Sequence, residues 1–226
     1  MGRTPCGTGK AIRKRTGNKM GSLTATSPLI LFLALLAYAF GSIPFGLLIG
    51  RRFAGTDIRR SGSGNIGATN VGRVLGKKWG VLTLCCDVGK AVVPLVIAMN
   101  ILEGARGRET FLAEIGLASF LGHIFPAYLK FKGGKGVATA LGGFLVLTPW
   151  VALAAVPVFL LAVLVSGYVS VGSLSAATAV PVLMWVSGCP KPYTALATVI
   201  AVLVWIKHRG NVRRLIKGEE KSYRRA

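Results

Sequence analysis

Six apolar stretches limit what this chain can fold into, because several of them have a length near or above that needed to cross a lipid bilayer. They occupy residues 27–49, 79–102, 111–129, 137–165, 169–186 and 193–206. These stretches give the chain its mean hydropathy of +0.59. Because about 20 apolar residues are typical of one transmembrane helix, the sequence predicts an all-α integral membrane protein.

The basic residues lie just outside the apolar stretches. Of the 28 Lys and Arg residues, 24 fall within residues 1–19, 51–78, 130–135 and 207–225. The net charge of +21 would suit nucleic acid, but no basic stripe interleaved with aromatic residues occurs on a soluble segment. The clustering follows the positive-inside rule, with added attraction to anionic lipid. We therefore expect a lipid bilayer as partner and no nucleic acid.

The same charges predict a topology. Loops 51–78 and 130–136 and the tail from residue 207 should be cytoplasmic, whereas loops 103–110 and 187–192 carry a weaker basic bias. This requires residues 137–165, which contain Pro149 and Pro157, to form two short segments, about 137–149 and 151–165. The result is about seven transmembrane helices, some short, with the N-terminus outside and the C-terminus cytoplasmic. Six spans with the N-terminus inside is the alternative, because the basic residues near the N-terminus violate the rule in the seven-span topology.

Three parts of the chain follow from this topology. Residues 1–26 are polar and basic and are expected to be a disordered tail, within which Met20 is an alternative start to Met1. Residues 27–208 form the transmembrane domain. Residues 209–226 form a cytoplasmic basic C-terminal segment.

Few charged side chains fall inside the apolar stretches. Asp87 and Lys90, spaced i, i+3, lie on one helix face and form either a self-satisfying ion pair or a device that orients the cytoplasmic loops. His123 precedes Pro126, which should kink or end its helix, and we interpret this histidine as a packed residue. Glu114 is expected at the outer interface in a structural role.

Three polar segments meet at the predicted inner surface. Two are rich in glycine, namely residues 59–73 (R-R-S-G-S-G-N-I-G-A-T-N-V-G-R) and 131–136 (F-K-G-G-K-G); the third holds His208 and Asn211, which share a face if the last helix continues. Glycines let a backbone approach a ligand closely, and N–H groups, hydroxyls and cations suit phosphate. The candidate binding side chains are Ser61, Ser63, Asn65, Thr69, Asn70, Arg73, Lys132, Lys135, His208 and Asn211.

The chemistry of these segments is also informative. The sequence has no G-x-S-x-G or H-E-x-x-H motif, no cysteine or histidine spacing suited to a metal, and no carboxylate in either glycine-rich segment. We expect no metal and no cofactor. A site of donors and cations without a nucleophile suits a substrate that arrives already activated, and positioning and charge stabilisation would then supply most of the catalysis.

Six motifs together resemble one known family. They are G-S-I-P-F-G at 41–46, S-G-S-G-N-I-G-A-T-N-V-G-R at 61–73, D-x-x-K at 87–90, G-H-I-F-P at 122–126, F-K-G-G-K-G-V-A-T at 131–139 and H-R-G-N-V-R-R-L at 208–215. Over about residues 29–217 the chain resembles the bacterial integral-membrane glycerol-3-phosphate acyltransferases that use acyl phosphate as donor. Like them, it lacks the H-x-x-x-x-D motif of other glycerolipid acyltransferases.

The resemblance implies a seven-helix enzyme of the bacterial cytoplasmic (inner) membrane with its active site facing the cytoplasm. The enzyme would transfer a fatty acyl group from acyl phosphate to the 1-hydroxyl of sn-glycerol 3-phosphate, giving lysophosphatidate and phosphate, the first acylation of phospholipid synthesis. It also implies a functional link to the enzyme that supplies acyl phosphate. The catalytic residues implied are Ser63, Arg73, Lys135, His208 and Asn211. The substrate-binding residues expected are Ser61, Gly62, Gly64, Asn65, Thr69, Asn70, Lys132, Gly133, Gly134 and Gly136.

Two other functions fit parts of the pattern. A carrier or channel for an organic phosphate would also need a basic inner vestibule, but such proteins show internal repeats and midplane sites, and no repeat relates the two halves. A non-catalytic lipid-binding scaffold would use the polybasic loops, but it would not need the glycine spacing or the pair His208 and Asn211.

Overall fold

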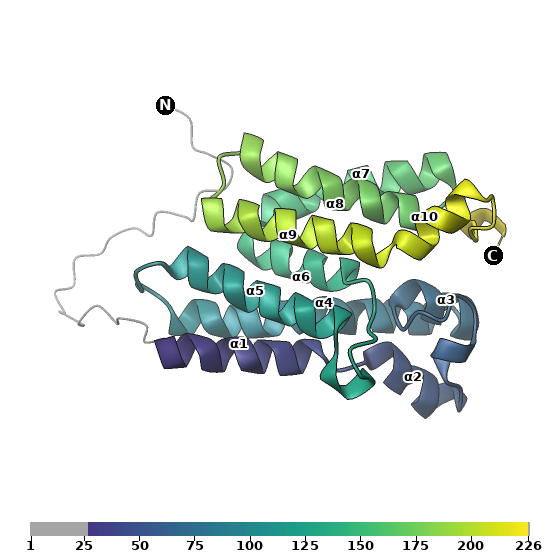
Figure 1. The fold of residues 1–226 in the computed structure, drawn as a ribbon, viewed down its shortest axis with the longest axis horizontal. Helices are drawn as coiled ribbons and strands as arrows, with labels where there is room; N and C mark the ends of the chain where they lie inside the picture. The colour runs from purple at the N-terminus through teal and green to yellow at the C-terminus, as the bar shows by residue number, and fades with distance from the viewer. Residues whose placement is uncertain (1–26, 226) are drawn as a thin grey trace.

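The computed structural model describes residues 27–225, and all regular structure within them is helical (Figure 1). The expected disordered tail and the choice between Met1 and Met20 lie outside the described residues. The α-helices are α1 (Ser27–Gly41), α2 (Phe45–Ala54), α3 (Ala68–Leu75), α4 (Lys77–Ile101), α5 (Arg108–Ile124), α6 (Val137–Leu147), α7 (Pro149–Ser166), α8 (Val169–Val186), α9 (Lys191–Lys207) and α10 (Arg209–Ile216). Short 3-10 turns occur at Ile58–Arg60, Ala127–Leu129 and Tyr223–Arg225.

The all-α membrane fold predicted from the apolar stretches is confirmed. Within residues 27–225, five helical segments are long and apolar enough to cross a membrane, and a sixth is added if α9 and α10, bent by 53°, are counted as one span. The first apolar stretch is not one straight helix, because α1 ends at Gly41 and α2 begins at Phe45, after Pro44. Proline removes a backbone donor and favours such a break. As predicted, Pro126 follows the end of α5.

The division of residues 137–165 into two helices is also confirmed. The boundary is Thr148, so Pro149 opens α7, whereas Pro157 lies inside it. Lys135, just before α6, bonds to Asn211, and Gly167, just after α7, accepts a hydrogen bond from Ser222. Asn211 and Ser222 both belong to the last part of the chain, so Lys135 and Gly167 lie at the same end of the helix bundle. The chain therefore runs away from that end in α6 and returns to it in α7. With 11 residues, α6 is only about 16 Å long.

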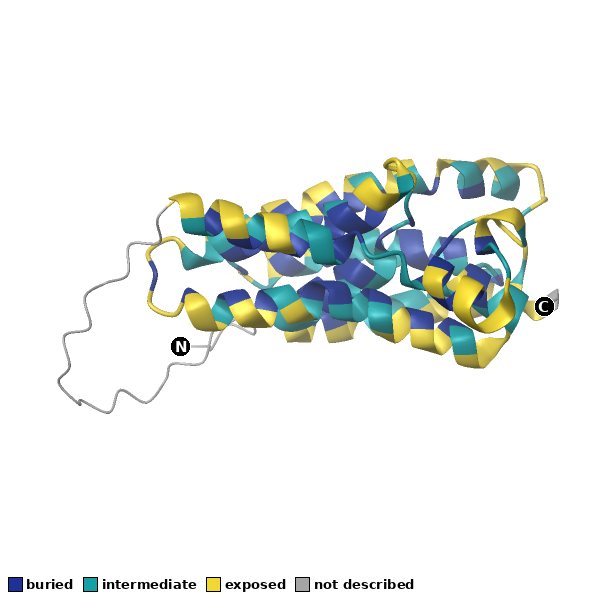
Figure 2. Ribbon diagram, turned by 90° about the horizontal axis from the view of Figure 1, so that it is seen from below, coloured by how far each residue is buried: buried dark blue, intermediate teal, exposed yellow. Residues whose placement is uncertain are grey.

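Small residues allow the helices to pack closely. A Cβ at Gly41 of α1 would lie 2.2 Å from the Ser119 carbonyl oxygen of α5. A Cβ at Gly122 of α5 would lie 2.3 Å from the Tyr38 carbonyl oxygen of α1. Such contacts are typical of helix pairs in membranes. The outer faces carry exposed apolar side chains, including Leu35, Ile97, Leu161 and Val202. Figure 2 shows these exposed faces around a buried interior, as expected when lipid is the solvent.

Candidate active site

One cavity of about 850 Å³ runs between the helices. Its polar end is formed by the segment before and within α3, the loop before α6, the α9–α10 junction and the C-terminal segment. Its other part is an apolar shaft between α6, α7, α8 and α9. The shaft is lined by apolar side chains that include Leu141, Phe144, Ala155, Phe159, Val180 and Ile200. An elongated molecule with an anionic head and an apolar tail would fit this division.

Asn70 organises the first glycine-rich segment. Its side chain is almost fully buried, and its Oδ1 accepts from the Ser63 N–H at 2.7 Å. Its Nδ2 donates to three backbone carbonyl oxygens, those of Ile58, Ser61 and Asn65. Gly62 has a φ of 65°, and a Cβ there would lie 2.2 Å from Asn70 Oδ1. The loop is therefore wrapped around one amide, and this leaves the exposed Ser63 at the cavity.

The second glycine-rich segment places Lys135 at the start of α6. Gly136, with a φ of 83°, is the N-cap of α6 and provides no side-chain cap. The first N–H groups of the helix therefore lie beside the cavity, where a helix N-terminus favours an anion. Lys135 Nζ donates to Asn211 Oδ1 at 2.6 Å. Burial lowers the pKa of Lys135 to about 8, although the charge of Glu220 opposes this shift.

The third polar segment lies at the bend between α9 and α10. The last helix does not continue straight past the membrane end, but His208 and Asn211 are both buried and both line the cavity. His208 Nδ1 lies 2.8 Å from the Val204 carbonyl oxygen. Because a carbonyl oxygen only accepts, Nδ1 carries the hydrogen and the neutral ring presents Nε2 as an acceptor.

The C-terminal segment closes the polar end, which the sequence reasoning missed. Glu220 accepts hydrogen bonds from Asn211, Arg214 and Ser170. Burial alone would raise the pKa of Glu220, but these hydrogen bonds outweigh it and hold the pKa below its ordinary value. Arg73 donates to the Lys221 carbonyl oxygen at 3.0 Å. The only signal in the sequence was the acidic pair at 219–220, which is unusual in a strongly basic tail.

The cavity brings together most of the predicted site. Of the predicted residues, Gly62, Ser63, Asn65, Thr69, Asn70, Arg73, Lys135, Gly136, His208 and Asn211 line it. The remaining predicted residues, Ser61, Gly64, Lys132, Gly133 and Gly134, do not line it. Gly133 and Gly134 pack instead against His123. Within residues 27–225, no group of three or more His, Cys, Asp and Glu side chains is placed to hold a metal ion.

Comparison with known proteins agrees with this geometry. The family model described as glycerol-3-phosphate acyltransferase matches residues 31–218. The chain belongs to the glycerol-3-phosphate acyltransferase family. A relative of that name from Desulfotalea psychrophila is 49% identical over 191 residues, which cover 84% of this chain and 96% of the relative. Another, from Anaeromyxobacter sp. (strain K), is 46% identical over 199 residues, which cover 87% and 99%.

Two crystal structures of a member of the glycerol-3-phosphate acyltransferase family have the same fold. They are of PlsY (YgiH), an integral membrane glycerol 3-phosphate acyltransferase, in its glycerol 3-phosphate form and its lysophosphatidic acid form. The TM-scores are 0.80 and 0.78, and the identity is 42%. Each comparison covers 86% of this chain and 95% of the other. The membership and the shared fold therefore extend over nearly all of the described residues.

Proposed function

We propose that this protein transfers a fatty acyl group from acyl phosphate to the 1-hydroxyl of sn-glycerol 3-phosphate. The products are lysophosphatidate and inorganic phosphate. The observation that carries this proposal is the cavity of about 850 Å³, in which a cationic end continues into an apolar part between the helices. Membership of the glycerol-3-phosphate acyltransferase family supports the acceptor. The donor rests on the resemblance of the sequence motifs to acyltransferases that use acyl phosphate, and a site of cations and donors suits an acyl group that arrives already activated.

The polar side chains have distinct roles in this mechanism. Arg73, Lys135 and Ser63, together with N–H groups at the start of α6, hold the phosphates of donor and acceptor. His208 and Asn211 orient glycerol 3-phosphate. The acceptor hydroxyl oxygen attacks the acyl carbonyl carbon and forms the new C–O bond. The bond from that carbon to the phosphate oxygen breaks, and phosphate leaves with the electron pair. The hydroxyl proton passes to a substrate phosphate oxygen.

His208 is the rival base, because its Nε2 is an acceptor. With a phosphate oxygen as base, we expect His208→Gln to keep kcat at saturating substrate within about fivefold of wild type, with the same dependence on pH. A histidine base would instead cost on the order of 10²–10⁴-fold. Steady-state acylation across the pH range of the assay separates the two. A kcat that falls by 10² or more would assign the base to His208.

Arg73→Lys is expected to lower kcat/KM for glycerol 3-phosphate by about 10–100-fold. A guanidinium binds phosphate through two parallel hydrogen bonds, and a lysine ammonium is a point charge that does not replace them. Acylation rates at varied glycerol 3-phosphate measure the loss. Arg52→Lys, an exposed arginine on α2, is the matched control and should remain at wild-type activity. An unchanged kcat/KM in Arg73→Lys would remove Arg73 from the phosphate site.

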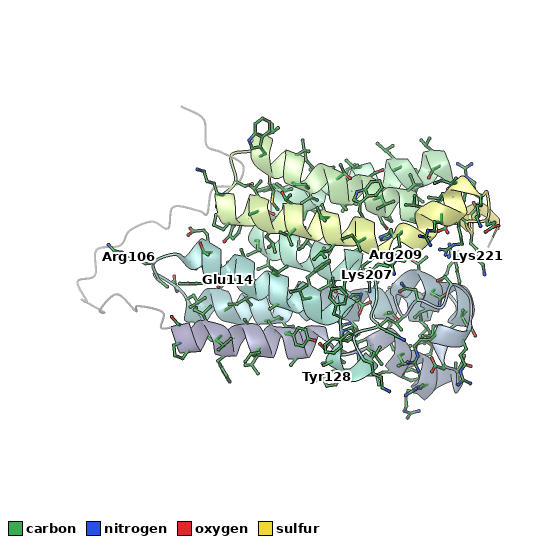
Figure 3. The ribbon with its side chains drawn as sticks, in the orientation of Figure 1. Arg106, Glu114, Tyr128, Lys207, Arg209 and Lys221 are labelled. Carbon is green, nitrogen blue, oxygen red and sulfur yellow. The ribbon has the colours of Figure 1, made fainter. Side chains whose placement is uncertain are left out.

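The membrane placement is part of the proposal. Seven crossings, with α6 as the short one, would put the N-terminus outside and the active site at the cytoplasmic face of the inner membrane. In Figure 3, Lys207, Arg209 and Lys221 lie toward one end of the molecule, and Arg106 and Glu114 lie toward the other. We further propose that residues 27–208 form the catalytic domain and that residues 209–226 form its cytoplasmic segment. Labelling of single cysteines introduced at residues 106 and 217, in intact cells and in lysed cells, tests the orientation.

The donor is tested with purified protein and labelled glycerol 3-phosphate. Acyl phosphate, acyl-CoA and acyl-carrier protein are supplied in separate reactions, and lysophosphatidate is measured. We expect product only with acyl phosphate. Product with another donor would overturn the donor assignment. Uptake of glycerol 3-phosphate into liposomes without acylation would favour a carrier instead.

A further inference from the structure

A buried polar cluster, formed by Asp87, Lys90 and His123, lies beside the second glycine-rich segment, and Asp87 and His123 also line the cavity. Lys90 Nζ is 2.8 Å from Asp87 Oδ1 and 3.2 Å from His123 Nδ1. All three side chains are at most 4% exposed. Lys90 also lies 5.4 Å from the ring centroid of Phe45. Because an ammonium only donates, His123 accepts at Nδ1 and, in its neutral form, carries its hydrogen on Nε2.

The cluster connects the three helices that surround the glycine segment. Lys90 and Asp87 lie on α4, and their carbonyl oxygens accept from Ser119 of α5 and Thr139 of α6 at 2.6 and 2.9 Å. A buried ion pair is weak evidence for stability, since apolar residues of similar volume often serve equally well. Charged residues at membrane depth are a default sign of function. Packing alone therefore does not account for these buried charges.

Gly134 packs against the imidazole of His123, and Gly133 packs against the backbone carbonyl of the same residue. The Gly134 N–H donates to the His123 carbonyl oxygen at 3.1 Å. A Cβ at Gly133 would lie 2.2 Å from that oxygen, and a Cβ at Gly134 would lie 2.2 Å from His123 Nε2. The next residue, Lys135, bonds to Asn211 inside the cavity. The orientation of the imidazole therefore determines where the backbone places Lys135.

We propose that Asp87, Lys90 and His123 are positioning residues, which hold the His123 ring as a fixed support for Gly133–Lys135 and so place Lys135 for phosphate. This rests on the proposed phosphate-binding role of the segment. Asp87 holds the Lys90 ammonium, and the ammonium fixes the tautomer and plane of the ring. Glycine is required at 134 because the ring leaves no space for a side chain, and at 133 because the His123 carbonyl oxygen and Pro126 leave none.

A double-mutant cycle tests the proposal. His123→Asn keeps an acceptor near Lys90 but removes the outer half of the ring, and Gly134→Ala adds a methyl group against that half. Each single variant is expected to lower kcat/KM for glycerol 3-phosphate by about tenfold or more. In the double variant the added methyl group has space, so its kcat/KM should equal or exceed that of the less active single variant. Independent sites would multiply their losses.

Controls keep this outcome separate from misfolding and from the donor assignment. Glu114→Gln, a charge removal at the exposed far end of α5, should leave activity unchanged alone and should not alter the loss caused by Gly134→Ala. Thermal unfolding in detergent reports folding. Asp87→Asn/Lys90→Gln removes both charges together and is expected to lower kcat/KM by at least tenfold while the protein stays folded. Each variant is compared with wild type using whichever acyl donor the wild-type protein accepts. An incorrect donor assignment would therefore change the wild-type donor assay and not the ratios between variant and wild type. Multiplying losses, or activity within twofold of wild type for His123→Asn, would overturn the proposal.

Discussion

Lys135→Gln is expected to lower kcat/KM for glycerol 3-phosphate by about 10³-fold, because one preorganised cationic donor in an active site contributes about 10²–10³ and the buried charge strengthens this. Lys135 is the residue at which the glycine segment, the start of α6 and Asn211 meet. Glutamine keeps a donor of similar length but removes the charge that balances two phosphates. Steady-state acylation measures the effect. Lys130→Gln, an exposed lysine of the same loop that does not line the cavity, is the control.

The depressed pKa of Lys135 adds a dependence on pH. In the free enzyme burial lowers this pKa to about 8, so the ammonium is present below pH 8 and is lost as the pH rises through that value. The kcat/KM for glycerol 3-phosphate should therefore fall above pH 8, by about tenfold per pH unit for one proton. Lys135→Arg should shift this fall to higher pH, since a guanidinium stays charged. If the alkaline fall stayed in place in Lys135→Arg, it would belong to another group.

Much of the fold could be predicted because membrane constraints act locally along the chain. The bounds of α8 coincide with one predicted stretch. The expectation that the basic segments before residue 137 and after residue 206 lie on the same side of the membrane correctly required a break between residues 137 and 165. Helix α3 was missed, because residues 68–75 contain glycine, threonine and asparagine and no long apolar run. The helix forms because tertiary contacts support it, including the close approach of Gly80 on α4 to Gly72. Local patterns do not carry such information.

The site was predictable to the extent that its residues lie next to the ends of the predicted membrane-spanning segments. Ser63, Arg73, Lys135, His208 and Asn211 all line one cavity, as their shared predicted depth required. Glu220 was not predictable, because it reaches the cavity only after the chain turns back beyond α10. The packing of Gly133 and Gly134 on a histidine depends on helix geometry that spacing alone does not specify. The sequence therefore indicated which residues gather at one cavity, and the structure added the contacts that support them.

Asn70→Leu is expected to lower kcat/KM by at least about 10³-fold, although Leu has a similar volume and Asn70 makes no catalytic contact in the proposed mechanism. The amide satisfies three carbonyl oxygens and the Ser63 N–H within a single loop. Each buried group that loses its partner costs roughly 1–3 kcal/mol, so the loop should leave its folded path and take Ser63 with it. Activity, thermal unfolding in detergent and proteolysis within residues 58–67 measure the three consequences.

The comparison that decides the role of Asn70 is Asn100→Leu. Asn100 is exposed on α4 and makes one hydrogen bond to its own helix, at Val96, so its replacement should change neither activity nor proteolysis. If Asn70 instead contacts substrate directly, as its place in the sequence motif suggested, Asn70→Leu would lose activity while the loop kept its resistance to protease. Loss of both together is the result expected here, because both amide hydrogens and one lone pair of the side-chain oxygen are already bonded to the loop.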